Sequence, residues 1–142
     1  MNLAHLFDIQ RELDQHIVEK HGLQNEDLLP KKILALQVEL GELANEWRGF
    51  KFWSEDQEPR KIVPKANCHA CSGTGLGDTG KFDCQNCDGE GVLYRYPLLE
   101  ELVDVFHFIL SIGLELGYDN VTTMTRRTFD DGVYAFHSMF DY

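Results

Sequence analysis

The chain of 142 residues carries a formal net charge of −11, and 43% of its residues are hydrophobic. This length suits one compact domain with its own core and room for one small insert, but it is too short for two full domains. The acidic balance argues against a protein that binds duplex DNA without sequence preference and against a membrane-surface protein, because both usually present a basic face.

A first amphipathic helix is predicted over residues 3–20. Apolar side chains recur there at the helical interval of three and four, at Leu3, Leu6, Phe7, Leu13, Ile17 and Val18. His21 and Gly22 end the pattern. Gln10 lies within the apolar stripe, where a buried amide needs hydrogen-bond partners, and either the backbone or a bound base would supply them.

A second helix is predicted from Pro30 to about Gly49, since proline is favoured in a first helical turn. Its apolar stripe consists of Leu36, Leu40, Leu43 and Trp47. Glu39, Glu42 and Glu46 are also spaced three and four apart, so they share a face about 100° from that stripe and border the core. Such a row, taken alone, is typical of an ordinary solvated face.

The segment from about Glu55 to Tyr96 is rich in Gly, Asp, Asn, Lys and Cys, which predicts a loop-rich insert without an apolar core. It holds all four cysteines in two copies of one pattern, "CHACSGTG" and "CQNCDGEG". Two such knuckles place four thiolates around Zn²⁺, and their glycines let backbone amides approach sulfur. We therefore predict a zinc site rather than disulfides or free thiols, with the ligands Cys68, Cys71, Cys84 and Cys87.

The cysteine repeat resembles the zinc-binding region of DnaJ-type co-chaperones, which has four copies where this chain has two. The resemblance supports a metal site but no chaperone function. A closed site of four cysteines leaves no open position for chemistry, so we expect the zinc to be structural. The insert joins the second helix to the next predicted one, so we expect it to fold over a ligand bound between them or to contact another macromolecule.

A third helix is predicted from Pro97 to Leu116, with Gly117 as its cap. Polar residues follow one seam along this otherwise apolar helix, at Glu101, Asp104, His107, Ser111 and Glu115. His107 is either a hydrogen-bonded core residue or a member of a site. A weaker fourth helix is predicted over residues 122–141, with apolar positions at Met124, Phe129, Val133, Phe136 and Phe140.

These elements predict an all-α four-helix bundle formed by residues 1–54 and 97–142, with a zinc-binding insert at residues 55–96. The third helix is apolar around most of its circumference, which favours a homodimer or a higher homo-oligomer. No segment is long and apolar enough to span a membrane, and the N-terminus lacks a secretion-signal pattern. Together with the paired cysteines, these features predict a cytoplasmic protein.

If the second and third helices face each other, their acids form one cluster of Glu39, Glu42, Glu101 and Asp104. Four carboxylates in a partly desolvated seam cannot all ionise unaided, because each charge raises the pKa of its neighbours. A hard divalent cation resolves this conflict, and Mg²⁺ in particular keeps waters and substrate phosphates among its ligands. Two or more such ions would polarise a phosphate and lower the pKa of an attacking water.

The pairs Glu39-x-x-Glu42 and Glu101-x-x-Asp104 resemble the metal-binding signature of the all-α nucleoside triphosphate pyrophosphatases, a superfamily that includes MazG-like enzymes and dimeric dUTPases. Three stretches resemble the dimeric dUTPase branch in particular: "LFDIQRELD" at residues 6–14, "LALQVELGELANEWRGFKFW" at 34–53 and "LLEELVDVFHFILSIG" at 98–113.

This resemblance implies that the four acids ligate Mg²⁺ and that a metal-activated water converts dUTP to dUMP and pyrophosphate. It also implies that Gln10 reads the uracil edge and that Lys51, Trp53 and His107 contact phosphate, base or sugar. Members of the branch carry basic and Asn residues near the last helix that help to hold the phosphates. This chain has no evident equivalent there, and Arg126 and Arg127 are the nearest substitutes.

Two alternatives to a dUTP-hydrolysing enzyme remain open. One is a binding or regulatory protein that keeps the bundle and uses the zinc insert to hold a protein or nucleic-acid partner. The other is the same chemistry on a different nucleoside triphosphate.

Overall fold

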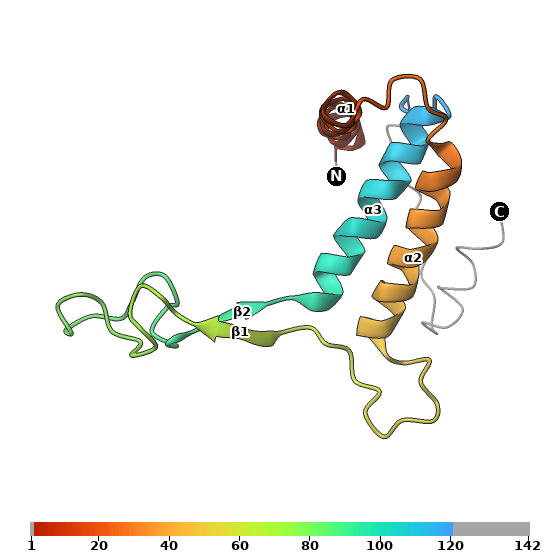
Figure 1. The fold of residues 1–142 in the computed structure, drawn as a ribbon. Coiled ribbons are helices and arrows are strands. Elements are labelled where there is room, and N and C mark those ends of the chain that lie inside the picture. The colour runs from red at the N-terminus through yellow and green to blue at the C-terminus, as the bar shows by residue number, and fades with distance from the viewer. Residues whose placement is uncertain (1, 121–142) are drawn as a thin grey trace.

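The computed structural model describes residues 2–120 and contains, within that range, three helices and a two-stranded ribbon that projects away from them (Figure 1). In chain order the elements are α1 (Leu3–His21), α2 (Leu29–Trp47), β1 (Val63–Asn67), β2 (Val92–Arg95) and α3 (Pro97–Glu115). The three helices lie where the sequence predicts them. The helix predicted over residues 122–141 falls outside the described residues, so the four-helix bundle stays a prediction.

The helix ends follow from residues at their boundaries. Asn2 caps α1, because its side chain accepts a hydrogen bond of 3.3 Å from the His5 amide, and Gly22 ends the helix with a φ of 67°. Arg48 ends α2 in the left-handed region that usually favours glycine, with a φ of 64°. Its buried guanidinium donates to the Asp56 carbonyl at 2.7 Å, and this contact fixes the loop that follows α2.

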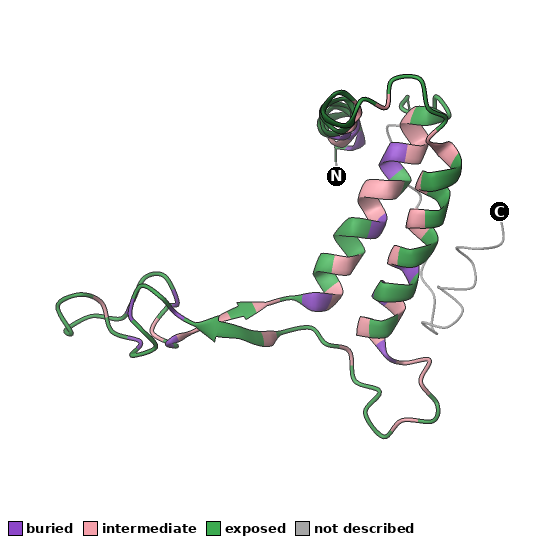
Figure 2. Ribbon diagram, in the orientation of Figure 1, coloured by how far each residue is buried: buried purple, intermediate pink, exposed green. Residues whose placement is uncertain are grey.

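α3 is the central helix of the described structure, because it packs against both α2 and α1. It runs alongside α2, whereas α1 crosses near its C-terminal half (Figure 1). Leu40 and Leu43 of α2 bury against Val105, and a second small core joins α1 to α3 through Leu3, Phe7 and Leu110. The buried residues of the helices accordingly lie mainly on their inner faces, and further buried residues lie in the insert (Figure 2). Two partners on different sides account for part of the apolar surface of α3.

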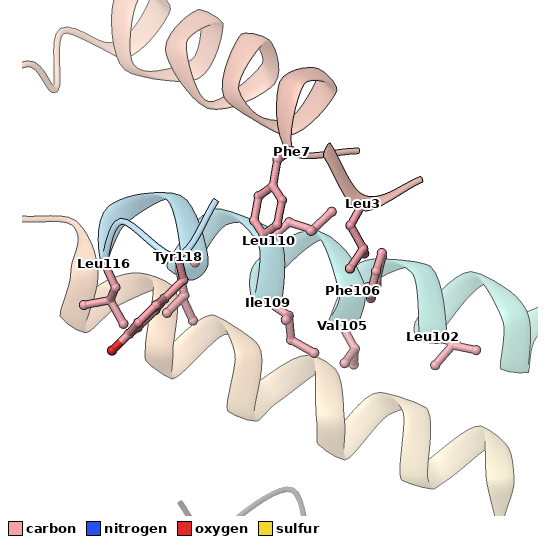
Figure 3. A pocket seen from close by; sticks show the side chains of 11 residues that line it. Leu3, Phe7, Leu102, Val105, Phe106, Ile109, Leu110, Leu116 and Tyr118 are labelled. Atoms are coloured by element: carbon pink, nitrogen blue, oxygen red, sulfur yellow. The ribbon is translucent and has the colours of Figure 1, made fainter. Parts of the chain in front are cut away.

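An apolar groove of about 560 Å³ follows α3 on the side of α1 (Figure 3). Leu3 and Phe7 of α1 point toward α3 at its centre. Gly113 forms part of the wall, and an added Cβ there would lie 3.1 Å from the Phe7 ring, so the small residue permits the close approach of α1. Leu102, Ile109 and Leu116 line the same groove and are about half exposed.

The two strands form an antiparallel ribbon in which Val63 pairs with Arg95 and Asn67 pairs with Val92. A bulge at Lys65 interrupts the register. The composition of this segment predicts only loops. β1 contains a proline and lacks alternating apolar residues, so nothing in its local pattern predicts a strand. Within residues 2–120, no helix combines the length and hydrophobicity needed to cross a membrane.

Candidate functional site

Four acids gather where α2 and α3 run side by side, and we call Glu39, Glu42, Glu101 and Asp104 the carboxylate cluster. Carboxylate oxygens of Glu39, Glu42 and Glu101 all lie within 4.8 Å of one another. Asp104 follows one turn along α3, and its charge acts on both Glu39 and Glu101. The acid rows of the two helices therefore face each other.

The small core beside the cluster fixes this arrangement. Leu40 and Leu43, which bury against α3, each follow an acid of the cluster directly in the sequence, and buried Val105 follows Asp104. An α-helix turns by about 100° per residue, so a buried leucine leaves its neighbour at the edge of the interface. The acids are consequently held at the rim of the α2–α3 contact, where Glu39 and Glu101 are partly buried and Glu42 is exposed.

Partial burial and the repulsion between neighbouring negative charges raise the pKa of two acids of the cluster. Partial burial raises the pKa of Glu39, and the charges of Glu42 and Asp104 raise it further. Partial burial likewise raises the pKa of Glu101, together with the charges of Glu42, Asp104, Glu39 and Glu46. Two oxygens bound to one Mg²⁺ lie at most about 4.2 Å apart, so small side-chain movements would suffice for these acids to share a cation. The donor set fits a hard divalent ion.

A polar network continues from the cluster along α3 toward α1. The Gln10 amide nitrogen donates to Asp14 at 2.7 Å, and the Gln10 amide oxygen lies 2.6 Å from Nδ1 of His107. Ser111 donates to the other oxygen of Asp14, and Lys32 of α2 forms ion pairs with Asp14 and with Glu115. The partners of buried Gln10 are thus side chains of the network.

A cavity of about 330 Å³ opens between the three helices next to this network. Ala35 lies in its wall one turn before Glu39 on α2, and Phe108 lies in its wall one turn after Asp104 on α3. Asp14, Lys31 and Lys32 supply its charged groups. The cavity therefore lies one helical turn from the carboxylate cluster on both α2 and α3, and Phe108 is the aromatic side chain among its described lining residues.

Asp14, Lys32 and Phe108 belong to this region but are not among the residues predicted from the sequence. Asp14 follows Gln10 by four residues and Phe108 follows Asp104 by four, so helical spacing alone would have put both on the relevant faces. Lys32 carries no such signal, because a lysine in a first helical turn is ordinary.

Lys51 and Trp53, which the sequence analysis placed in the site, lie in the loop after α2. Trp53 is 65% exposed and packs edge-on against Phe50 and Phe52 at centroid distances of 5.8 and 5.0 Å. The Lys51 ammonium lies 5.7 Å from the centre of the Phe50 ring. The described contacts of Lys51 and Trp53 are with this aromatic loop.

The four cysteines form a separate, buried cluster at the far end of the ribbon. Sγ of Cys68 lies 3.9 Å from that of Cys84, and Sγ of Cys71 lies 3.8 Å from that of Cys87. A tetrahedron of sulfurs around zinc at about 2.3 Å has edges of about 3.8 Å. The sulfur spacing is therefore that of a zinc site, and the group could bind zinc.

Hydrogen bonds to sulfur support the same conclusion. The amides of Gly75 and Gly91 donate to Cys71 and Cys87 at 3.3 and 3.2 Å. The Asn86 side chain donates to Cys68 and lowers the pKa of that thiol to about 6, whereas burial raises the pKa of Cys87 to about 12. Thiols this close cannot all ionise without a cation.

The two knuckle glycines are required by geometry. Gly75 and Gly91 have φ angles of 76° and 72°, and a Cβ added to them would lie 2.2 and 2.5 Å from backbone carbonyl oxygens of the opposite knuckle. No other residue fits at these positions, so the repeated Cys-x-x-Cys-x-Gly-x-Gly pattern describes one interlocked unit.

The model of a family described as dUTPase matches residues 2–65 and 95–141, which leaves out the segment that carries the cysteines. No curated protein and no solved structure matches the chain.

Proposed function

The chain belongs to the dimeric all-α dUTPase family of the MazG-like superfamily, and on this premise we propose that it hydrolyses dUTP to dUMP and pyrophosphate with bound Mg²⁺. The family is one of nucleotide pyrophosphatases, so the chain is an enzyme of this class. The observation that carries the assignment of the site is the meeting of two acid pairs, one from α2 and one from α3, beside a cavity in the helix bundle.

In this proposal the carboxylate cluster holds the metal and the adjoining cavity receives the nucleoside. Bound Mg²⁺ would neutralise the triphosphate and lower the pKa of an attacking water. Glu39, Glu42, Glu101 and Asp104 act as its ligands, and the raised pKa values of Glu39 and Glu101 support a site that needs a cation. Phosphoryl chemistry of this kind depends on positioning and charge neutralisation, which carboxylates provide without a nucleophilic side chain.

We assign base recognition to Gln10 and His107, whose hydrogen bond spans α1 and α3 near the cavity. Uracil presents one N–H between two carbonyl groups, so its recognition needs donors and acceptors in a fixed order. The contact of Gln10 with Asp14 fixes the orientation of the amide. Phe108 in the cavity wall offers a ring face or edge to a base, and Lys51 and Trp53 would reach the substrate only if their loop closes over the site.

The insert at residues 55–96 is, in this proposal, folded by one structural Zn²⁺ bound to four cysteines, because it has no apolar core of its own. We also propose a homodimer, in which the half-exposed apolar residues of α3 are covered by the partner. A regulatory protein that uses the knuckle to hold a macromolecule is the second candidate, favoured by the projection of the ribbon away from the helices.

The function is tested by pyrophosphate release from a panel of nucleoside triphosphates with Mg²⁺. We expect dUTP to be turned over fastest, and we expect Glu39→Gln and Asp104→Asn each to abolish turnover. If another nucleotide is turned over faster than dUTP, the proposed reaction is correct but the proposed substrate is wrong. If no nucleotide is turned over, while a macromolecular partner is retained through residues 64–93, the regulatory function is correct instead. Light scattering of the purified protein tests the homodimer.

A further inference from the structure

We propose that Arg60 binds the terminal phosphates of the substrate and, after cleavage, the pyrophosphate. This inference rests on the proposed function, because it takes the carboxylate cluster as the metal site. Arg60 would supply a cation for the phosphate tail in the described part of the chain. It lies outside the acid rows and the aromatic loop, so the sequence patterns do not predict it as a site residue.

The backbone of Arg60 is clamped between the two helices that build the cluster. Its amide donates to the Glu46 carbonyl in the last turn of α2 at 3.0 Å, and its carbonyl accepts from the Leu98 amide in the first turn of α3 at 3.2 Å. A residue in an irregular segment is thereby held at a fixed place between α2 and α3. Only its side chain remains free to move.

The Arg60 side chain makes one weak ion pair in the described structure and is about half exposed. Its Nη1 lies 3.4 Å from Oε1 of Glu46, which is long for an ion pair, and 49% of the side chain is exposed. A guanidinium has five N–H donors, so most of them are available to a ligand. Glu46 continues the acid row of α2 one turn beyond Glu42, and its charge acts on Glu101 of the cluster. Arg60 therefore borders the metal site.

The parts of the proposed site follow one another along α2. Ala35 lines the nucleoside cavity, Glu39 and Glu42 belong to the cluster, and Glu46 with Arg60 comes last. A nucleotide with its base in the cavity and its reacting phosphates at the cluster would extend its phosphate tail toward Arg60. The N-terminus of α3 lies at the same end, and its dipole favours negative charge.

Two other cations of the described helices and their loops, Arg48 and Lys32, are held more firmly elsewhere. Buried Arg48 binds Asp56 through two hydrogen bonds to its carbonyl and through its carboxylate. Lys32, with 15% of its side chain exposed, is shared by Asp14 and Glu115. Arg60 combines a fixed backbone, an exposed guanidinium and a position beside the cluster.

The experiment compares wild type with Arg60→Gln, Arg60→Lys and Lys61→Gln. Gln keeps the backbone contacts of residue 60 and removes the charge, whereas Lys61 is an exposed neighbour outside the proposed site. Binding of three probes is measured by calorimetry with Mg²⁺: a non-hydrolysable dUTP analogue with an imido group between the α- and β-phosphates, dUMP, and inorganic pyrophosphate. We expect Arg60→Gln to weaken the analogue and pyrophosphate by about tenfold or more, the loss of one charge-assisted contact, and to leave dUMP unchanged. Arg60→Lys should retain part of the affinity, and Lys61→Gln should match wild type.

A purely structural role is separated by the double variant Glu46→Gln/Arg60→Gln. If Arg60 only neutralises Glu46, removing both charges restores pyrophosphate binding, whereas a direct phosphate contact leaves it weak. Unchanged pyrophosphate affinity in Arg60→Gln, or an equal loss for dUMP, overturns the inference. Wild type that binds pyrophosphate through Arg60 but not the dUTP analogue would refute dUTP as the substrate and leave the inference standing. Wild type that binds neither probe refutes both.

Discussion

Gln10 of α1 and His107 of α3 meet across 97 residues of sequence, with the amide oxygen 2.6 Å from Nδ1 of the ring. The amide nitrogen of Gln10 donates to Asp14, so its oxygen must be the atom that faces His107. Nδ1 of His107 therefore carries the proton, and in the neutral ring Nε2 is left as an acceptor. By orienting the Gln10 amide, Asp14 thus also determines the hydrogen-bonding pattern of His107.

Replacing Gln10 with alanine removes both contacts at once. His107 and Asp14 each lose a partner in a partly buried place, so we expect a loss of about 1–3 kcal/mol in the free energy of unfolding. If Gln10 reads the base, discrimination between dUTP and other pyrimidine triphosphates should also decrease. Denaturant unfolding and the ratio of kcat/KM values measure the two effects.

Gln15→Ala is the matched control, because Gln15 is an exposed glutamine of the same helix that bonds only to Glu19 in the described structure. We expect it to change neither stability nor base preference appreciably. A Gln10→Ala enzyme with full discrimination would show that Gln10 is a core residue of the network and not a base reader.

Glu101→Gln should stabilise the metal-free protein while it weakens the metal site. The charge of Glu101 is opposed by four other acids nearby, so its removal relieves repulsion by about 0.5 kcal/mol after solvent screening. For a chain of this size that corresponds to a rise in Tm of about 1–2 °C. Mg²⁺ should raise the Tm of wild type and have little effect on the variant. Glu12→Gln, at an exposed position of α1, is the control. Equal Mg²⁺ responses in wild type and Glu101→Gln would place the metal elsewhere.

The same cluster predicts a pH dependence. The pKa values of Glu39 and Glu101 are raised in the folded protein, so the folded state binds protons more readily than the unfolded state there. Their contribution to stability is present below the unfolded pKa and is lost as the pH rises through the folded pKa. Mg²⁺ competes with these protons, so the Tm increment it produces should be small at about pH 4 and complete at about pH 7. An increment that does not vary with pH would contradict carboxylate ligands.

Helical periodicity predicted most of what builds the site. The spacing of three and four identified α1, α2 and α3, and it put the acid pairs on faces that the structure brings together. What periodicity could not supply is the order of contacts between helices. The sequence placed Gln10 in a stripe and His107 in a seam, but only packing shows that they bond to each other and that Asp14 holds Gln10 in place.

The insert was harder to predict in its backbone than in its chemistry. The cysteine spacing predicted a metal-type cluster, because two Cys-x-x-Cys pairs in one short segment are more typical of a metal site than of disulfides or free thiols. The ribbon that carries them has no periodic signal, since its strands are short and one contains Pro64. Strand pairing here follows from bringing the two knuckles together, which is a constraint of tertiary structure.

The knuckle yields a prediction that separates a steric requirement from a conformational one. Gly75 and Gly80 both have a positive φ, of 76° and 65°. A methyl group at Gly75 would lie 2.2 Å from the Gly89 carbonyl oxygen, whereas nothing lies within 4 Å of the same group at Gly80.

Alanine costs about 1–2 kcal/mol in this conformation at either site, but only at residue 75 must the backbone move and carry its N–H away from Cys71. Gly75→Ala should therefore lose zinc to a chelator much faster than wild type, and Gly80→Ala should resemble wild type. Because the cysteine cluster lies on the projecting ribbon, apart from the cores of the helices, the helical circular dichroism of both variants should be unchanged. Equal zinc retention in the two alanine variants would mean that the opposing knuckle yields to the methyl group and that the interlocked glycines are not required for the metal.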